Sequence, residues 1–138
     1  MVIVKELLLD TDGNTDIIDI TNKVQEALKD IELKDGIVTI SSSGSTISFT
    51  TIEFEPALVE DLKDFFEKCI PQNKHYRHDD TWGDANGYAH LRASLLGPSM
   101  IIPFENQKLV LGTWQQLILI DFDNRPRKRK VRLTFIGS

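Results

Sequence analysis

The side chains that could do chemistry gather in one stretch of the chain, residues 75 to 94. All three histidines of the protein, His75, His78 and His90, lie within it, together with the polar residues Asp79, Asp80, Asp84 and Asn86. Imidazole titrates near neutral pH, and imidazole and carboxylate are common ligands of divalent transition ions. This stretch is therefore the first candidate for a catalytic or metal-binding site.

His78, Asp84 and His90 follow one another at six-residue intervals. Three protein ligands leave a coordination position open for water or substrate, as in catalytic zinc sites. We therefore predict that these residues bind a divalent metal, zinc or magnesium, and that His78 and His90 are catalytic. The spacing matches no standard zinc signature. A polar loop whose histidines only form hydrogen bonds or face water is the alternative.

A short helix is predicted from Asn86, its N-cap, to about residue 96, where a Gly-Pro pair ends it. Its free backbone N–H groups and the positive end of its dipole would accept a phosphate or carboxylate. Asn86, His90 and Ser94 lie at i, i+4 and i+8 and form one polar edge, and Arg92 adds a positive charge. Asn86, Arg92 and Ser94 are thus candidate ligand-binding residues. Ordinary capping of a short helix is the alternative.

Two further sets of residues are candidates. Glu53 and Glu55 face the same side at strand spacing and could act as an acid–base pair, or could mark a strand end near a helix N-terminus. Trp114 and Gln115 place an aromatic ring beside an amide and could receive a planar heterocycle. Packing of the ring against a neighbouring subunit is the alternative for Trp114.

Periodicity predicts the elements that position these groups. Strands are expected at residues 2–9, 16–20, 37–42, 46–54, 99–104, 108–111, 115–122 and 128–136, and helices at 22–33, 56–70 and 86–96. Strands 37–42 and 46–54 are expected to be neighbours, and Thr21 to cap the first helix. Strand 115–122 is apolar on both faces and should be central. The pattern is typical of a strand-rich α+β domain with three helices.

Two other features allow more than one interpretation. Residues 125–132 hold six basic side chains in eight positions, which suits nucleic-acid binding, a charged edge strand, or a strand paired with the acidic half across a subunit interface. In strand 128–136, Val131, Leu133 and Phe135 should point inward. Cys69 lies on the apolar stripe of the second helix and is expected to be a buried structural thiol.

Length and composition predict a single domain covering residues 1–138. No apolar run approaches the roughly 20 residues of a membrane helix, no secretory signal is visible, and a single cysteine favours a reducing compartment. A cytoplasmic location is expected. Up to residue 70 there are 15 acidic and 6 basic residues, and from residue 71 there are 6 acidic and 10 basic. The net negative charge of the whole chain makes nucleic acid an unlikely partner, whereas the net positive charge of residues 71–138 suits a small phosphorylated molecule.

The second half of the chain resembles the YjbQ-type family, also called the secondary thiamine-phosphate synthases. The residues that carry the resemblance are His78, the run Gly83-Asp84-Ala85-Asn86-Gly87-Tyr88-Ala89-His90-Leu91-Arg92-Ala93-Ser94-Leu95-Leu96-Gly97-Pro98-Ser99, then Leu111-Gly112-Thr113-Trp114-Gln115-Gln116 and Asp121-Phe122-Asp123. The resemblance implies an α+β fold around a mostly antiparallel, barrel-like sheet. It also implies a homotrimer with a site near the subunit boundaries that often holds a divalent metal.

The resemblance further implies a weak secondary ability to join the pyrimidine and thiazole halves of thiamine phosphate. By the same resemblance, His78, Asp84 and His90 would hold the metal, with Asn86 and Ser94 close by and with Trp114 and Gln115 lining the pocket. The chain departs from the family in one place. Many members have a His-Thr-Thr-Ala stretch where this chain reads Gly44-Ser45-Thr46-Ile47, so a histidine is missing at about Ser45. Either Glu53 or Glu55 would then take its role, or the protein is a non-enzymatic trimer that binds a metal or metabolite.

Overall fold

The computed structural model describes all residues from Met1 to Ser138. Its elements are, in order, β1 (Val2–Thr11), β2 (Asp16–Asp19), α1 (Thr21–Lys29), β3 (Gly36–Ser41), β4 (Ile47–Ile52), α2 (Pro56–Cys69), α3 (Asp79–Trp82), α4 (Gly87–Leu96), β5 (Ser99–Glu105), β6 (Lys108–Leu109), β7 (Gln116–Asp121) and β8 (Arg127–Gly137). Every strand pairing is antiparallel, so the predicted α+β fold with a mostly antiparallel sheet is confirmed. The prediction of three helices is wrong by one, because α3 has four residues and is too short to show an apolar period.

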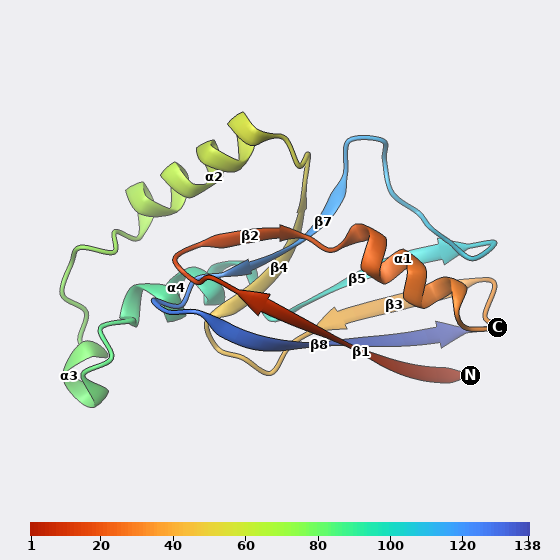
Figure 1. Ribbon diagram of the computed structural model, residues 1–138, viewed down its shortest axis with the longest axis horizontal. Coiled ribbons are helices and arrows are strands. Elements are labelled where there is room, and N and C mark those ends of the chain that lie inside the picture. The colour runs from red at the N-terminus through yellow and green to blue at the C-terminus, as the bar shows by residue number, and fades with distance from the viewer.

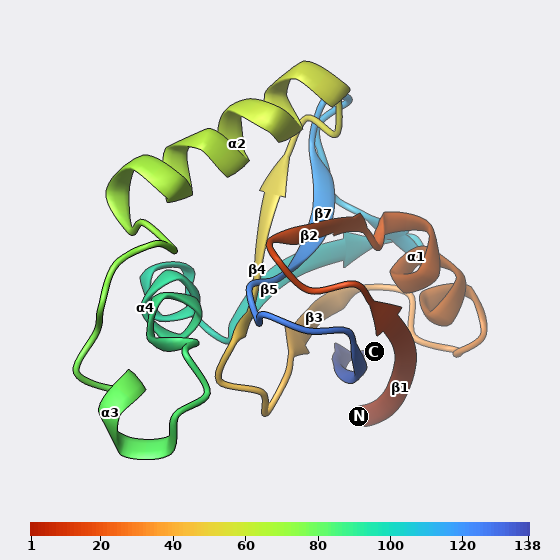
Figure 2. The same ribbon diagram turned by 60° about the vertical axis from the view of Figure 1, so that its left-hand side comes forward.

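The strands form two sheets. The larger has the order β1-β8-β3-β5-β6 and the smaller β2-β7-β4. The views in Figures 1 and 2 agree in placing α1 on one side of the molecule and α2, α3 and α4 on the other. None of these helices combines the length and apolar character that crossing a membrane would require.

Strand β7 lies between two packed cores, as its apolar faces predict. Leu117 and Leu119 point toward the larger sheet and join the main core, which also contains buried residues of β3, β4, β8 and α1. Ile118 and Ile120 point the other way and pack against α2 and α4 in a second core. The molecule therefore has three layers: the larger sheet, the smaller sheet, and the pair α2 and α4.

Strand β8 has the predicted alternation, and only its first half lies at an open edge of the sheet. Val131, Leu133 and Phe135 are fully buried. The strand lies between β1 and β3 over residues 132–137, but residues 127–131, which hold most of the basic run, pair with β1 alone. The interpretation of a charged strand edge therefore holds for this first half of β8 and not for the second half. Its exposed basic side chains face the acidic half of the same chain, because Arg132 is paired with Glu6 and Lys128 with Asp10 of β1.

Two other expectations need correction. β3 and β4 are consecutive but belong to different sheets, since β3 pairs with β5 and β8 while β4 pairs with β7. Helix α1 ends at Lys29, four residues earlier than predicted, and its N-cap is Ile20 rather than Thr21. The Asp19 carboxylate accepts hydrogen bonds from the N–H and the hydroxyl of Thr21 (2.9 and 2.6 Å) and so takes the capping role expected of Thr21.

Helix α2 begins at Pro56 as predicted, but its apolar stripe is only partly covered. Phe66 is fully buried, whereas Phe65 is 50% exposed and Cys69 is exposed. The expectation of a buried structural thiol at Cys69 is therefore wrong. The reason is the position of α2 at the outside of the molecule, where it packs with one face only (Figure 2).

Candidate functional site

The structure brings His78 and His90 together. Their imidazole rings meet edge to face, with 4.5 Å between the centroids and 62° between the ring planes. His78 immediately precedes α3, and His90 lies in the first turn of α4. Both side chains are half-buried. Two titratable rings twelve residues apart in the sequence thus form one pair.

Asp79 holds the two histidine-bearing segments in place. One carboxylate oxygen accepts the N–H of Gly87, the first residue of α4 (2.9 Å), and the other accepts the N–H of Tyr76 (3.0 Å). These two backbone hydrogen bonds lower the pKa of Asp79 and keep it ionised. An anionic side chain therefore already caps the start of α4, in the way expected at a helix N-terminus. Asn86 is the N-cap residue as predicted, but its side chain forms no capping bond.

A small polar cavity lies next to the start of α4. It has a volume of about 140 Å³ and is lined by Asp84, Asn86, Asn124, Arg125 and Arg127. No apolar side chain lines it, and two of its five residues are cationic. The Asn124 amide donates to the backbone oxygen of Asp84 (2.7 Å), which ties the β7–β8 turn to the segment before α4. Such a lining suits an anion or another strongly polar group.

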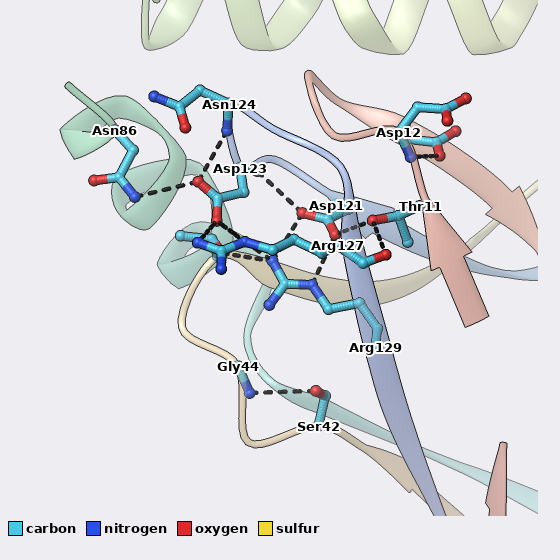
Figure 3. A network of polar contacts seen from close by, with 12 residues as sticks. Thr11, Asp12, Ser42, Gly44, Asn86, Asp121, Asp123, Asn124, Arg127 and Arg129 are labelled. Carbon is cyan, nitrogen blue, oxygen red and sulfur yellow. Dashed lines mark hydrogen bonds and ion pairs between the residues drawn. The ribbon is translucent and has the colours of Figure 1, made fainter. Parts of the chain in front are cut away.

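A buried ionic network supports this cavity from beneath (Figure 3). Asp121 receives two hydrogen bonds from Arg129, from Nε (2.7 Å) and from Nη2 (2.9 Å), and a third from the Thr11 hydroxyl (2.6 Å). Asp123 accepts a hydrogen bond from Arg127 Nε (2.7 Å) and forms an ion pair with Arg127 Nη2 (2.6 Å). The side chains of Asp121 and Asp123 are 0% and 1% exposed. Arg127, one of the two arginines that line the cavity, is therefore held in place by the fully buried carboxylate of Asp123.

Asn86 links the same network to α4. Its Nδ2 donates to Asp123 Oδ1 (3.2 Å), while its Oδ1 is buried and has no hydrogen-bond partner. Burial by itself would raise the pKa of Asp123, but hydrogen bonds from Asn86, from the N–H of Asn124 and from Arg127 outweigh it, and the pKa lies below its usual range. Asp123 is thus a permanent anion between the cavity and the core. The buried, unpartnered Oδ1 is an exception to the usual pairing of buried polar atoms.

Sequence reasoning missed Asp121, Asp123, Arg127 and Arg129 as a group. Arg127 and Arg129 were counted with the exposed basic run, although they share the inward parity of Val131. Likewise Asp121 continues the inward row of Leu117 and Leu119. The alternation of these strands was the signal that could have found them.

The remaining candidates on α4 lie outside the cavity lining. Arg92 is 3% exposed, and its guanidinium donates hydrogen bonds to partners inside the protein. Its partners are the backbone oxygen of Ile70 (2.8 and 3.0 Å), the Thr15 hydroxyl (2.9 Å) and Glu67 (2.8 Å). Ser94 is exposed, and its hydroxyl donates to the Leu91 oxygen (2.8 Å). Arg92 therefore has a structural position between α4 and the end of α2 and does not line the polar cavity.

Glu53, Glu55 and Trp114 gather in a different cavity, of about 490 Å³, with Asp19, Phe54, Pro56, Thr113 and Gln116. Because Ile47 pairs with Asp121 and Ile52 with Gln116, this cavity and the histidine pair lie at opposite ends of β4 and β7. Glu55 caps α2 by accepting the N–H groups of Ala57 (2.7 Å) and Leu58 (2.9 Å), so the helix-terminus interpretation holds for it. Gln115 is exposed, and its amide reaches Thr51 (3.3 Å).

The predicted metal ligands do not form a closed set within one chain. His78 and His90 are adjacent, but the Asp84 carboxylate is exposed and lines the neighbouring cavity. No three His, Cys, Asp or Glu side chains of the chain are grouped closely enough to hold a metal ion. The residues therefore do not fit the three-ligand centre. The divalent metal stays a prediction.

Electrostatics keep His90 neutral. Burial lowers its pKa, the neighbouring His78 lowers it further, and Asp123 and Asp84 oppose the shift without cancelling it. Because the folded-state pKa lies below that of a free imidazole, protonation of His90 weakens the fold and occurs only at acidic pH. At neutral pH His90 is a proton acceptor.

We expect Arg129→Met to lower the free energy of unfolding by about 3–5 kcal/mol, because it leaves the carboxylate of Asp121 buried without its charge partner. Arg132→Met, on the same strand but exposed, should cost less than about 0.5 kcal/mol. Urea unfolding at one fixed protein concentration measures both. Equal effects of the two substitutions would contradict the structural role of the buried network.

We also expect the Cε1 proton resonance of His90 to titrate below pH 6.5, the ordinary imidazole value, in an NMR pH titration. His78→Gln should move the pKa of His90 upward, since it removes one of the two causes of the lowering. His75→Gln is the matched control, because His75 is exposed and pairs with Asp80 (3.1 Å). If the pKa of His90 is the same in His78→Gln as in the wild type, the two rings do not interact.

Comparison with known proteins places these features in one family. The family model described as UPF0047 protein YjbQ-like matches residues 5–138. A UPF0047 protein of Archaeoglobus fulgidus is 42% identical over 126 residues, which cover 91% of this chain and 95% of the relative. The UPF0047 protein YugU of Bacillus subtilis is 30% identical over 135 residues, covering 96% of this chain and 98% of that protein.

Solved structures agree with the fold. A YbjQ-like protein of unknown function from Sulfolobus solfataricus superposes with a TM-score of 0.94 at 28% identity, covering 100% of this chain and 99% of the other. An uncharacterised protein of the YjbQ/UPF0047 family from Clostridium acetobutylicum gives a TM-score of 0.87 at 34% identity, covering 96% and 99%. With a family model over nearly the whole chain, close relatives and this shared fold, the chain belongs to the UPF0047 family of YjbQ-like proteins.

Proposed function

We propose that the protein is a transferase that acts on a phosphorylated or pyrophosphorylated small molecule, with thiamine-phosphate synthase-like secondary activity. The observation that carries this proposal is that His90, which pairs with His78, lies on the helix whose N-cap Asn86 lines the cavity of Arg125 and Arg127. One part supplies a proton acceptor and the other supplies positive charge. Both are needed where a phosphate group is held while a bond next to it is made or broken.

The size of the cavity limits what enters it. Its 140 Å³ is smaller than the roughly 300–1,000 Å³ of pockets that bury a drug-sized ligand, so it has room for a phosphate group but not for an entire substrate. Arg125 and Arg127 can offer charge-assisted hydrogen bonds to phosphate oxygens. The organic part of the substrate then lies outside the cavity, toward the histidines.

The chemistry follows from the charges. Where the attacking group is a hydroxyl or an amine, the neutral ring of His90 accepts its proton and the adjacent ring of His78 orients that ring. The thiazole nitrogen of the thiamine-phosphate reaction carries no proton and needs no such acceptor. The two arginines stabilise the negative charge that builds on a departing phosphate or pyrophosphate. Arg127 is held in position by Asp123, so its charge needs no rearrangement during the reaction.

The alternative is a non-enzymatic protein that binds a metal or a metabolite. It is favoured by the separation of Glu53 and Glu55 from the histidine pair, because neither can replace an absent acid–base group within the same chain. In that case the polar cavity binds its ligand without turnover. A large shift of the melting temperature on chelation, together with no turnover of any phosphorylated substrate, would support binding alone.

We expect the wild-type gene to rescue growth of a thiamine-auxotrophic strain that lacks thiamine-phosphate synthase, and His90→Ala to abolish rescue because it removes one ring of the histidine pair next to the cavity. His75→Ala removes an exposed histidine that lies outside the cavity and should rescue like the wild type. Protein levels are compared by immunoblot. Rescue that survives His90→Ala would rule out this site, and failure of the wild type to rescue would favour the binding protein.

We also propose that the chain works as a homotrimer in the cytoplasm, without nucleic acid. Val2, Ile136, Ile37 and Pro103 lie in one row across the outer face of the larger sheet, and Ile101 lies in the next row. All are exposed. Such an apolar face on a sheet suits contact with other copies. A neighbouring copy could bring the cavity of Trp114 close to the histidine pair, which one chain keeps apart.

Light scattering after gel filtration should give a mass of three 15.7 kDa chains. Ile101→Lys should lower this mass, because it buries a charge in the apolar contact. Phe65→Lys places the same change on the exposed side of α2 and should leave the mass unchanged. A wild-type protein that runs as a monomer would refute the trimer.

A further inference from the structure

We propose that a second anion site lies where the chain leaves β3, and that it binds a phosphate dianion. It is a cavity of about 280 Å³ lined by Ser42, Ser43, Gly44, Lys128, Arg129 and Lys130. It shares no lining residue with the cavity beside the histidines. The site therefore stands on residues of its own, independent of the proposed transferase activity.

The cavity arises because β8 loses one of its partners. Pairing with β3 extends only from Gly137 to Arg132, whereas pairing with β1 continues to Arg127. Residues 128–131 therefore have one open edge, which faces the β3–β4 loop. In an antiparallel sheet alternate residues direct their N–H and C=O groups to opposite sides, so part of this backbone points into the open edge.

Arg129 presents an unused donor to this space. Its Nε and Nη2 are committed to Asp121 and to the Thr46 hydroxyl (2.8 Å), while Nη1 takes part in no hydrogen bond or ion pair. Nη1 lies beside Gly44, where an added Cβ would come within 3.0 Å of it and within 2.7 Å of the Ile47 Cγ2 (Figure 3). Glycine thus keeps the approach to Nη1 open. The guanidinium is held rigid before any ligand arrives.

The remaining lining completes an anion receptor. Lys128 and Lys130 are exposed and flank Arg129, and no acidic or apolar side chain lines the cavity. The Ser42 Oγ accepts the N–H of Gly44 (3.2 Å), so its own O–H remains free to donate. Arg129 belongs to the inward row of β8 and Lys128 and Lys130 belong to the outward row, so this open edge is lined by cationic residues from both faces of the strand and by two serines. Such a lining suits a phosphate with part of its hydration shell.

The test is an amide-resolved NMR titration of the full chain with inorganic phosphate, against sodium chloride at matched ionic strength. Saturable shifts are expected at the amides of Ser43, Gly44 and Lys130. The double substitution Lys128→Gln with Lys130→Gln should weaken this binding by about tenfold or more, since it removes two of the three charges. Lys23→Gln with Lys108→Gln, which changes the net charge equally at exposed positions outside the cavity, should change it by less than about twofold.

Gly44→Ala is a second, independent variant that fills the space beside Nη1 and should abolish the shifts, with amides of the remote β5 strand reporting that the fold is intact. The inference is overturned if the shifts do not saturate, if chloride reproduces them, or if the Lys128 and Lys130 substitutions leave the affinity unchanged. The amides of Asn86 and Asn124 report the other cavity in the same spectra. Failure of one site is therefore visible separately from failure of the other.

Discussion

The ion pairs of Asp121 with Arg129 and of Asp123 with Arg127 join the two sheets at the point where the apolar core ends. Burying charges of this kind costs several kcal/mol per ion unless their hydrogen bonds are complete. In this protein the hydrogen bonds of the two carboxylates are complete. Besides the arginines, Thr11 donates to Asp121 and Asn86 donates to Asp123, and a backbone N–H group donates to each carboxylate. Strand β1, the β3–β4 loop through Thr46, the β7–β8 turn and the start of α4 all take their positions from these two carboxylates.

Much of the fold follows from periodicity. The two-faced apolar run of β7 could only be a buried strand, and the alternation of Val131, Leu133 and Phe135 defined the inner face of β8. Assignment of strands to sheets did not follow, because the Ser-Gly-Ser segment between β3 and β4 could equally well close a hairpin or carry the chain from one sheet to the other. The choice is made by long-range partners, β7 for β4 and β8 for β3, which no local pattern contains.

The candidate site, like the fold, could be predicted only in part from the sequence. His78 and His90 were predicted from residue type, yet their contact depends on Asp79, which joins the starts of two helices through backbone hydrogen bonds. Glu53 and Trp114 were grouped with them by chemistry and by family resemblance, but β4 and β7 carry them to the far end of the smaller sheet. The buried arginines were overlooked because a run of like charges suggests a solvated surface, whereas strand parity sends every second one inward.

The two chain ends are hydrogen-bonded to each other. The Met1 ammonium donates to the Gly137 oxygen (3.0 Å), and the Gly137 N–H donates to the Met1 oxygen (3.1 Å), so β1 and β8 are in register to their last residues. The residues that lead into β1 and out of β8 therefore lie side by side. A circular permutant that links residues 1 and 138 and opens at the exposed segment near residue 73, which belongs to no strand, would retain every strand pairing.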